Sequence, residues 1–495
     1  MKKLSLILIL LLAVILRFYN NTAVALWHDE AFSALYIKYP WGEMMHRIIL
    51  DVHPPLYYFI LRFWSYVFGS GLLSLRALSI IFGVLTVWMG YKLIWQAFKN
   101  RTWALFAALF LAINPFQIQY ALEARMYTLG TFLLLLSSWL LLRALEQNKF
   151  KDWVFYGITV AACLYTHYYL AFSIIAQGLY LLYHLIKNRQ FDFADLKNSR
   201  LYRAAAAIIL SSLLYIPWLS AFNEQRSRVQ QSFWIPPMDR WSIPGTIWKM
   251  VFGGTGINRP TLFVATIVAI LILIYFIRKI KMQEKWLLVL GLVIPFLAAI
   301  ALSYQTAIYL DRYFVFASMF LAMILGISIL QIEKLKLRKG LAWIAVLVTI
   351  FVFYKNWTEL DVKAFGQPVK KPGMSAAAEY INERAGKNDK IYVGSSFVYF
   401  TFKYYNQTGI KPLLYSTGPI ESIPHFSGTA ILTNEDLVLD FNQAEPNDNV
   451  WLLWTTGFGG SKPVVPGNWQ VVEEVGFEDA PGFKGWIVIT RYHVN

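Results

Sequence analysis

The sequence Trp27-His28-Asp29-Glu30 follows the first hydrophobic run of the chain, and Asp51-Val52-His53-Pro54-Pro55-Leu56-Tyr57-Tyr58 comes shortly after it. Both stretches combine carboxylates and a histidine with aromatic residues, and both lie beside apolar sequence. A charged side chain is costly next to a lipid bilayer unless it has a partner or a role. These stretches are therefore the first candidates for a functional site, with the surrounding apolar sequence as its scaffold.

The composition indicates a polytopic membrane protein. Of the 495 residues, 57% are hydrophobic and only 15% are charged, whereas about a quarter of the residues of soluble domains are charged. Uncharged runs as long as a membrane-spanning helix recur along the chain, for example residues 126–142, 286–302 and 313–330. We therefore predict a polytopic α-helical membrane protein.

The net charge of +16 is unevenly distributed along the chain. Residues 357–495 contain 11 Lys and Arg against 15 Asp and Glu, so the basic excess lies entirely in residues 1–356. Much of it falls in short loops between apolar runs, as the positive-inside rule predicts for cytoplasmic loops. The charge therefore indicates membrane topology, and we expect no nucleic-acid partner.

The N-terminal apolar run, residues 4–18, follows two lysines and is expected to be a first span with a cytoplasmic N-terminus. A cleaved signal peptide is the alternative, because Ala23-Val24-Ala25 resembles a cleavage site. Arg17 and the two asparagines after Tyr19 separate the apolar run from that site, which argues for a retained span.

Residues 55–68 are apolar but short, aromatic and interrupted by Arg62, which favours a helix lying at the membrane interface. If this segment does not cross, the basic loops all fall on the cytoplasmic side. The later spans are then 75–98, 102–117, 127–145, 153–167, 168–186, 204–222, 260–277, 286–303, 313–330 and 340–356. We predict about 11 spans plus interfacial helices, in the plasma or inner membrane.

Residues 1–356 are expected to form this membrane domain, with long external loops at 19–74 and 223–259. Residues 357–495 differ in composition and predict a soluble α/β domain on the extracytoplasmic side. Its expected elements are a helix at Ser375–Ala385 and strands at Lys390–Gly394, Thr429–Thr433, Val450–Thr455, Trp469–Val475 and Gly485–Arg491.

Asp29 and Glu30 are the first candidates for chemistry. A carboxylate at the membrane surface can remove a proton from an incoming hydroxyl, and its neighbour can orient it. Solvated acidic residues are the simpler interpretation. Asp51 and His53 follow on the approach to two prolines. These four residues could also be metal ligands. Their spacing matches no recognised metal-ligand motif, but a divalent metal stays an open alternative.

Further polar clusters fall in the predicted external turns. Glu123 and Arg125 lie in one of them, where they could simply pair with each other, or where the arginine could bind a lipid phosphate. His167 lies in another turn, and Arg312 and Tyr313 lie at the start of a later span. Aromatic anchoring at the interface explains the tyrosines, but it explains neither His167 nor Arg312.

Together these residues resemble the GT-C glycosyltransferases that use polyprenyl-phosphate sugars. In particular, they look like the bacterial relatives of dolichyl-phosphate-mannose protein mannosyltransferases and of aminoarabinose lipid A transferases. The resemblance covers roughly residues 1–330 and rests on the following motifs: Trp27-His28-Asp29-Glu30, His53 to Tyr58, Arg76, Tyr120–Tyr127 and Asp311-Arg312-Tyr313.

The resemblance implies a GT-C fold and an inverting transfer of a sugar from a lipid phosphate to a hydroxyl of a protein, a glycolipid or a glycan. Asp29 matches the family's catalytic acidic position, and Glu30 would support it. Some relatives have lysine at the position of His53. The other residues expected to bind the donor phosphate or the substrate are Tyr58, Asp51, Glu123, Arg125, His167, Arg312 and Tyr313.

The resemblance requires no metal or nucleotide cofactor. The competing hypothesis is a transporter or flippase of lipid-linked sugars. Such a protein would be expected to place ionisable groups in the middle of its spans, whereas here they gather at one predicted external face.

Overall fold

The computed structural model describes residues 2–19, 21–190, 199–231, 234–254, 258–337, 339–341, 343–344, 347, 350–351, 373–441, 443–457, 460–479 and 485–495. The chain divides into two compact units. The helical unit comprises Met1–Tyr19, His53–Ile60 and Arg76–Tyr354. The mixed unit comprises Asn20–Val52, Leu61–Leu75 and Lys355–Asn495.

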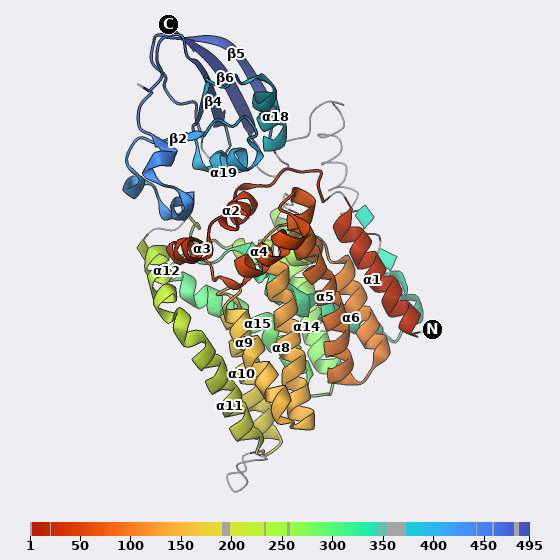
Figure 1. Ribbon diagram of the computed structural model, residues 1–495. Coiled ribbons are helices and arrows are strands. Elements are labelled where there is room, and N and C mark those ends of the chain that lie inside the picture. The colour runs from red at the N-terminus through yellow and green to blue at the C-terminus, as the bar shows by residue number, and fades with distance from the viewer. Residues whose placement is uncertain are drawn as a thin grey trace. The chain divides into compact units, whose positions relative to one another are not determined.

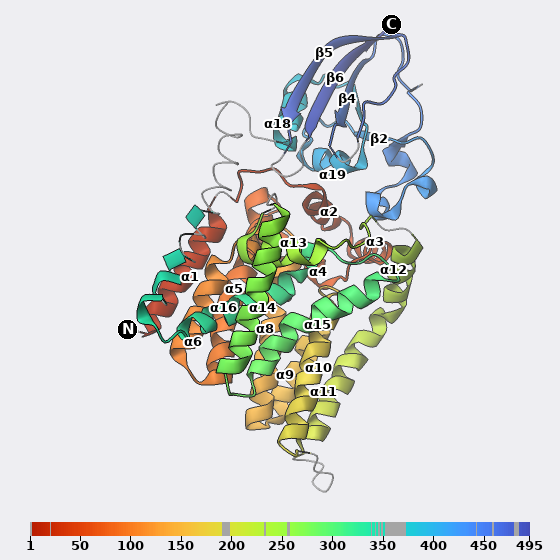
Figure 2. The ribbon, with the colours of Figure 1, turned by 180° about the vertical axis from the view of Figure 1, so that it is seen from behind.

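The helical unit is a bundle whose long helices run side by side (Figures 1 and 2). Its first helices are α1 (Lys2–Phe18), the start of α4 (Leu56–Phe68), most of α5 (Leu72–Phe98), α6 (Arg101–Ile113), α7 (Pro115–Ala121) and α8 (Tyr127–Gln147). Next come α9 (Phe150–Leu164), α10 (Leu170–Lys187), α11 (Arg200–Tyr215), η1 (Ile216–Trp218), α12 (Leu219–Gln231) and α13 (Ser242–Phe252). The last are α14 (Arg259–Lys279), α15 (Lys285–Ser303), η2 (Asp311–Phe314) and α16 (Val315–Leu330).

Seven helices in the described part of the chain are long and apolar enough to cross a membrane, and an eighth span results if α6 and α7, which are bent by 58°, form one broken span. These eight coincide with eight of the predicted spans. Two more predicted spans correspond to α1 and α9, which have only 17 and 15 residues. The last predicted span, 340–356, lies largely outside the described residues.

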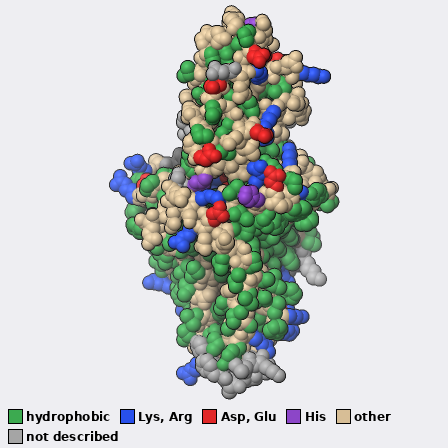
Figure 3. Space-filling model, turned by 60° about the vertical axis from the view of Figure 1, so that its left-hand side comes forward, with side chains coloured by type: hydrophobic (Ala, Val, Ile, Leu, Met, Phe, Trp, Pro, Cys, Tyr) green, Lys and Arg blue, Asp and Glu red, His purple; other side chains and the backbone are tan. Residues whose placement is uncertain are grey.

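The outer surface of the bundle is apolar. Large hydrophobic side chains are exposed along the helices, including Phe263 and Leu271 of α14, each 58% exposed, and hydrophobic atoms cover the sides of the helical unit in Figure 3. A soluble monomer rarely exposes so much contiguous apolar surface, whereas lipid favours it. The predicted fold class, a polytopic α-helical membrane protein, is confirmed.

The mixed unit is built on a six-stranded sheet with the order β3-β2-β1-β4-β6-β5. The strands are β1 (Lys390–Val393), β2 (Leu413–Tyr415), β3 (Leu437–Val438), β4 (Asn449–Thr455), β5 (Trp469–Glu478) and β6 (Trp486–Val494). The first four pair in parallel, and β6 joins β4 and β5 in antiparallel pairs. The predicted soluble α/β domain is thus confirmed.

The helices of the mixed unit are α2 (His28–Tyr36), α3 (Trp41–Leu50), the end of α4, α18 (Met374–Arg384) and α19 (Ser396–Tyr405). The prediction of a helix at Ser375–Ala385 is confirmed by α18. The strand predicted at Thr429–Thr433 is wrong, because Gly428 adopts a left-handed conformation and a 3-10 turn, Thr429–Ile431, follows it. The turn buries Ala430 and Ile431 without pairing them in the sheet.

Candidate functional site

In the helical unit, His53, Tyr58 and Arg125 come together. Arg125 lies in the turn between α7 and α8 and is only 2% exposed. Its Nη1 donates to the Tyr58 hydroxyl at 3.3 Å, and its Nη2 lies 3.4 Å from Nε2 of His53. A guanidinium held in this way offers fixed, charged donors of the kind that bind phosphate oxygens.

Several neutral contacts fix this turn in place. The backbone N–H of Arg125 donates to the carbonyl of Glu123 at 2.7 Å. The hydroxyl of Ser79, on α5, donates to the carbonyl of Arg125 at 3.3 Å and lies 3.3 Å from the hydroxyl of Tyr57. The turn is therefore attached to both α4 and α5, and its position depends on the packing of the bundle.

The backbone at His53 is held by a further helix of the bundle, α12. Its carbonyl accepts a hydrogen bond from Nε2 of Gln225, on α12, at 3.4 Å. The side-chain oxygen of Gln225 accepts in turn from Tyr168, whose hydroxyl accepts from Trp218 at 3.0 Å. Gln225 and Trp218 could not be found by sequence reasoning, because their role depends on contacts between residues far apart in the chain.

His167 joins this group through its ring, which is 4% exposed and centred 6.2 Å from the ring of His53. Its Nδ1 accepts the backbone N–H of Tyr169 at 3.1 Å, so a neutral ring carries its proton on Nε2. Burial lowers the pKa of His167 well below its usual value, and the nearby charges of His53 and Arg125 lower it further. His167 is therefore a neutral N–H donor, whose Nε2 has no hydrogen-bond partner within the described ranges.

Tyr313 and Arg312 lie in η2, before α16. The Tyr313 ring is centred 4.8 Å from that of His167, which brings Tyr313 into the same group. The Arg312 guanidinium lies 5.8 Å from the ring centre of Trp234. Asp311, beside it, pairs with Lys249 of α13, a contact that the sequence did not predict.

Asp29 and Glu30 belong to the mixed unit, where they form the first turn of α2. Glu30 is fully buried, and its carboxylate accepts the backbone N–H of Trp27 at 3.3 Å. Asp29 is half-buried, and its position in the first turn favours its negative charge through the helix dipole. The structure thus gives Glu30 a capping contact, while Asp29 presents a carboxylate at the helix start.

Helix α19 holds this segment in place. The hydroxyl of Tyr405 accepts the backbone N–H of Leu26 at 2.9 Å. The ring of His28 is centred 5.4 Å from that of Phe397 and 5.3 Å from that of Phe400. Asp51, in the same unit, is the C-cap residue of α3, and its backbone N–H donates a hydrogen bond to the carbonyl of Ile48.

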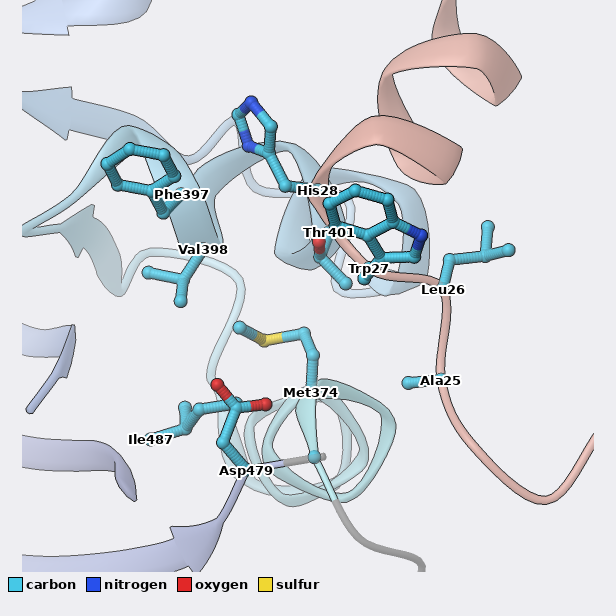
Figure 4. Close-up of a pocket in the computed structure, with 11 residues that line it drawn as sticks. Ala25, Leu26, Trp27, His28, Met374, Phe397, Val398, Thr401, Asp479 and Ile487 are labelled. Carbon is cyan, nitrogen blue, oxygen red and sulfur yellow. The ribbon is translucent and has the colours of Figure 1, made fainter. Parts of the chain in front are cut away.

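A small hollow, partly open to solvent, adjoins the segment (Figure 4). Its walls include Trp27 and His28 on one side and Met374, Asp479 and Ile487 on the other. Within the described ranges, no group of three or more His, Cys, Asp or Glu side chains is arranged to hold a metal ion.

The structure therefore gathers His53, Tyr58, Arg125, His167 and Tyr313 into one group, with Glu123 in the same turn as Arg125. Arg312 adjoins the group through Tyr313. The candidates Asp29, Glu30 and Asp51 lie in the other unit.

Comparisons with known proteins bear on the fold of the chain. The family model described as dolichyl-phosphate-mannose-protein mannosyltransferase matches residues 52–219, about a third of the chain. ArnT from Cupriavidus metallidurans, in its apo state, aligns with 98% of this chain and 97% of its own, with a TM-score of 0.62 and 13% identity. The chain has the GT-C fold. The same ArnT bound to undecaprenyl phosphate aligns over the same shares, with a TM-score of 0.59 and 12% identity.

The predicted resemblance to GT-C glycosyltransferases is thus confirmed for the fold, and the protein is a multi-pass membrane protein. The family match begins one residue before His53, and it includes Tyr58, Glu123, Arg125 and His167. A search of curated protein sequences finds no match.

Proposed function

We propose that this protein is a membrane glycosyltransferase that moves a sugar from a polyprenyl-phosphate donor to a hydroxyl of an extracytoplasmic protein, glycolipid or glycan. The acceptor oxygen attacks the anomeric carbon and forms the new C–O bond from the face opposite the phosphate. The bond between that carbon and the phosphate oxygen breaks, and the phosphate leaves with the electron pair. The configuration at the anomeric carbon is therefore inverted.

The observation that carries this proposal is the buried Arg125, held against Tyr58 and His53. It lies inside the segment that matches the mannosyltransferase model, in a chain with the fold of an ArnT whose structure contains undecaprenyl phosphate. A fixed guanidinium stabilises the negative charge that develops on a leaving phosphate. His53, when protonated, and Arg312 would add positive charge.

Asp29 is the general base in this proposal. Its carboxylate takes the proton of the acceptor hydroxyl as the new bond forms. Glu30, through its hydrogen bond to Trp27, fixes the helix start that presents Asp29. The neutral Nε2–H of His167 donates to the donor sugar-phosphate, and Tyr313 packs beside it.

The proposed transfer needs no metal cofactor. We further propose that the protein lies in the plasma or inner membrane, with its N-terminus in the cytoplasm and residues 357–495 on the extracytoplasmic side. Chelation with EDTA should leave transfer unchanged. A loss that is restored by one divalent cation would revise the proposal to a metal-assisted transfer.

The test is sugar transfer from radiolabelled polyprenyl-phosphate sugars by the purified protein, with cell-envelope extract as the source of acceptors. Wild type should transfer label, and Asp29→Asn should lower the rate by about 10²–10⁴-fold, the range of general base catalysis. Glu43→Gln, on α3 of the same unit, is the matched control, because Glu43 pairs with Arg47 at the surface.

Equal transfer by wild type and Asp29→Asn would remove Asp29 as the base and direct attention to Glu30 or Asp51. No transfer from any donor would favour the alternative, a transporter of lipid-linked sugars. Reconstitution in vesicles, with accessibility of the labelled lipid headgroup as the readout, would then test that alternative.

A further inference from the structure

Arg17, near the end of α1, is buried in the helical unit with 1% exposure. Its Nη1 donates to the carbonyl of Ala112 at 2.9 Å, and its Nη2 donates to that of Leu111 at 3.1 Å. A third contact, at 3.4 Å, reaches the carbonyl of Ala13 in its own helix. Among the described residues Arg17 pairs with backbone carbonyls and with no carboxylate. Burying a cation without a counter-ion costs free energy. A structural role that offsets this cost is therefore expected for Arg17.

The carbonyls that Arg17 binds lie at the end of α6, where the chain bends by 58° into α7. In a continuous helix the carbonyl of Leu111 would accept the N–H of residue 115, but residue 115 is proline and has none. The last carbonyls of a helix need other donors, and positive charge is favourable there. Arg17 therefore caps α6 from a different helix.

The other side of the bend is held by amide side chains. Asn114 accepts the N–H of Gln117 at 2.9 Å and donates to the carbonyl of Met250, on α13, at 2.8 Å. Gln117 donates to the carbonyl of Val315, at the start of α16, at 2.8 Å. Helix α7 is thus attached to α13 and α16, and Arg17 attaches the end of α6 to α1.

Helix α7 leads directly into the turn that carries Arg125. A methyl group at Gly83, on α5, would lie 3.1 Å from Nε of Arg17 and 3.1 Å from Cβ of Ala121, the last residue of α7. One helical turn earlier on α5, Ser79 donates to the carbonyl of Arg125. The Arg17 side chain, the end of α7 and the Arg125 turn are therefore packed along one face of α5.

We propose that Arg17 is a positioning residue for Arg125. By capping the bend between α6 and α7, it sets the direction of α7 and hence the place of the turn that presents the guanidinium of Arg125. This inference rests on the proposed function, since Arg125 is taken to bind the donor phosphate. Arg17 itself touches no substrate.

The first experiment compares Arg17→Met and Arg17→Lys in the purified full-length protein. Loss of hydrogen bonds from a charged donor should lower kcat about 10–100-fold in Arg17→Met, with the KM for the acceptor changed little. Arg17→Lys keeps the charge and should recover part of the rate.

Lys285→Met is the matched control. Lys285 caps the end of α14 in the same manner, with its Nζ 2.7 Å from the carbonyl of Ile277 and 2.8 Å from that of Ile280. That helix does not lead to the Arg125 turn, so kcat should change less than about threefold. An equal loss in both variants would mean that Arg17 only stabilises the bundle, and would overturn the inference.

A double-mutant cycle tests whether Arg17 acts through Arg125. In an Arg125→Met background, Arg17→Met should lower kcat by less than about twofold more, because coupled residues are not additive. Multiplicative losses would overturn the inference. If Arg17→Met does not fold, Gly83→Ala replaces it in the cycle, since the added methyl presses on Arg17 and Ala121 without removing the charge.

Hydrogen exchange gives a readout that does not need activity. The backbone amides of residues 116–126 should exchange faster in Arg17→Met, and in Gly83→Ala, than in wild type or Lys285→Met. Unchanged exchange there would overturn the positioning role even if the protein is a transferase. Faster exchange in a protein that transfers no sugar would instead reject the proposed function and leave the cap standing.

Discussion

The turn that carries Arg125 is held from within the helical bundle, whereas the segment that carries Asp29 is held by the sheet-containing mixed unit. Arg125 is buried among α4, α5 and their neighbours through Tyr58, His53 and Ser79. Asp29 sits half-exposed at the start of α2, with α19 behind it. The difference indicates that the soluble domain helps to position the proposed base, whereas contacts within the bundle position the proposed phosphate-binding group.

The largest effect on the bundle side is expected from Arg125→Met. Removing a fixed donor that stabilises developing charge should lower kcat about 10²–10³-fold. Arg125→Lys keeps a charge but cannot reach Tyr58 and His53 together, so it should recover only part of the rate. Steady-state transfer with a saturating donor measures both.

Arg101→Met, at the exposed start of α6, serves as the control and should transfer at the wild-type rate. Equal rates for Arg125→Met and Arg101→Met would end the assignment of phosphate binding to the bundle side.

On the mixed-unit side, Glu30→Ala should lower kcat about tenfold. The change removes the carboxylate that accepts the N–H of Trp27 and leaves a void at a fully buried position. Loss of a capping contact costs about 1 kcal/mol, and Asp29, one residue earlier, would shift with it. Glu30→Gln retains an acceptor oxygen and should stay within about threefold of wild type. A loss in Glu30→Gln as large as that in Asp29→Asn would instead make Glu30 the base.

Sequence patterns predicted the eight spans found in the described residues, the strands of the sheet except β2 and β3, and the candidate residues that the bundle gathers. The spans were predictable because each depends on its own run of apolar residues. Helix α19 was missed because its aromatic residues are typical of strands, while their burial against α2 decides the structure. In the sequence, Arg17 served only as an argument against a cleaved signal peptide. Its cap joins residues 94 and 95 positions apart, which no local pattern shows.

A smaller effect is expected from Tyr405→Phe, which removes the hydroxyl that α19 offers to the N–H of Leu26. The loss of one neutral hydrogen bond, about 1 kcal/mol, should lower kcat about fivefold if α19 positions Asp29. Tyr404→Phe is the control, because the neighbouring hydroxyl donates to the carbonyl of Ser70 at 2.8 Å. Identical rates for the two variants would mean that the soluble domain does not position the base.

The smallest effect on transfer at pH 7 is expected from Asp436→Asn in the mixed unit. This change should affect stability and leave the transfer rate unaltered. Asp436 is 5% exposed. Its carboxylate accepts a hydrogen bond from Nζ of Lys403 at 3.1 Å and another from the backbone N–H of Thr433. Although burial opposes its charge, Lys403 and Thr433 together hold the pKa of Asp436 below its usual value. Since the folded pKa is lowered, the stabilisation is present above the pKa that Asp436 has in the unfolded chain, and it disappears as the pH falls through the folded pKa.

Asp436→Asn should therefore lower the unfolding midpoint of the mixed unit at pH 7, and the difference from wild type should shrink in acid. Thermal unfolding followed from pH 7 to pH 3 measures this, with exposed Asp440→Asn as the control. A difference that stays constant with pH would show that the contact contributes through shape rather than charge. At pH 7 and at temperatures well below the unfolding midpoint, Asp436→Asn should transfer sugar at the wild-type rate. The change alters the stability of the scaffold and not the position of Asp29.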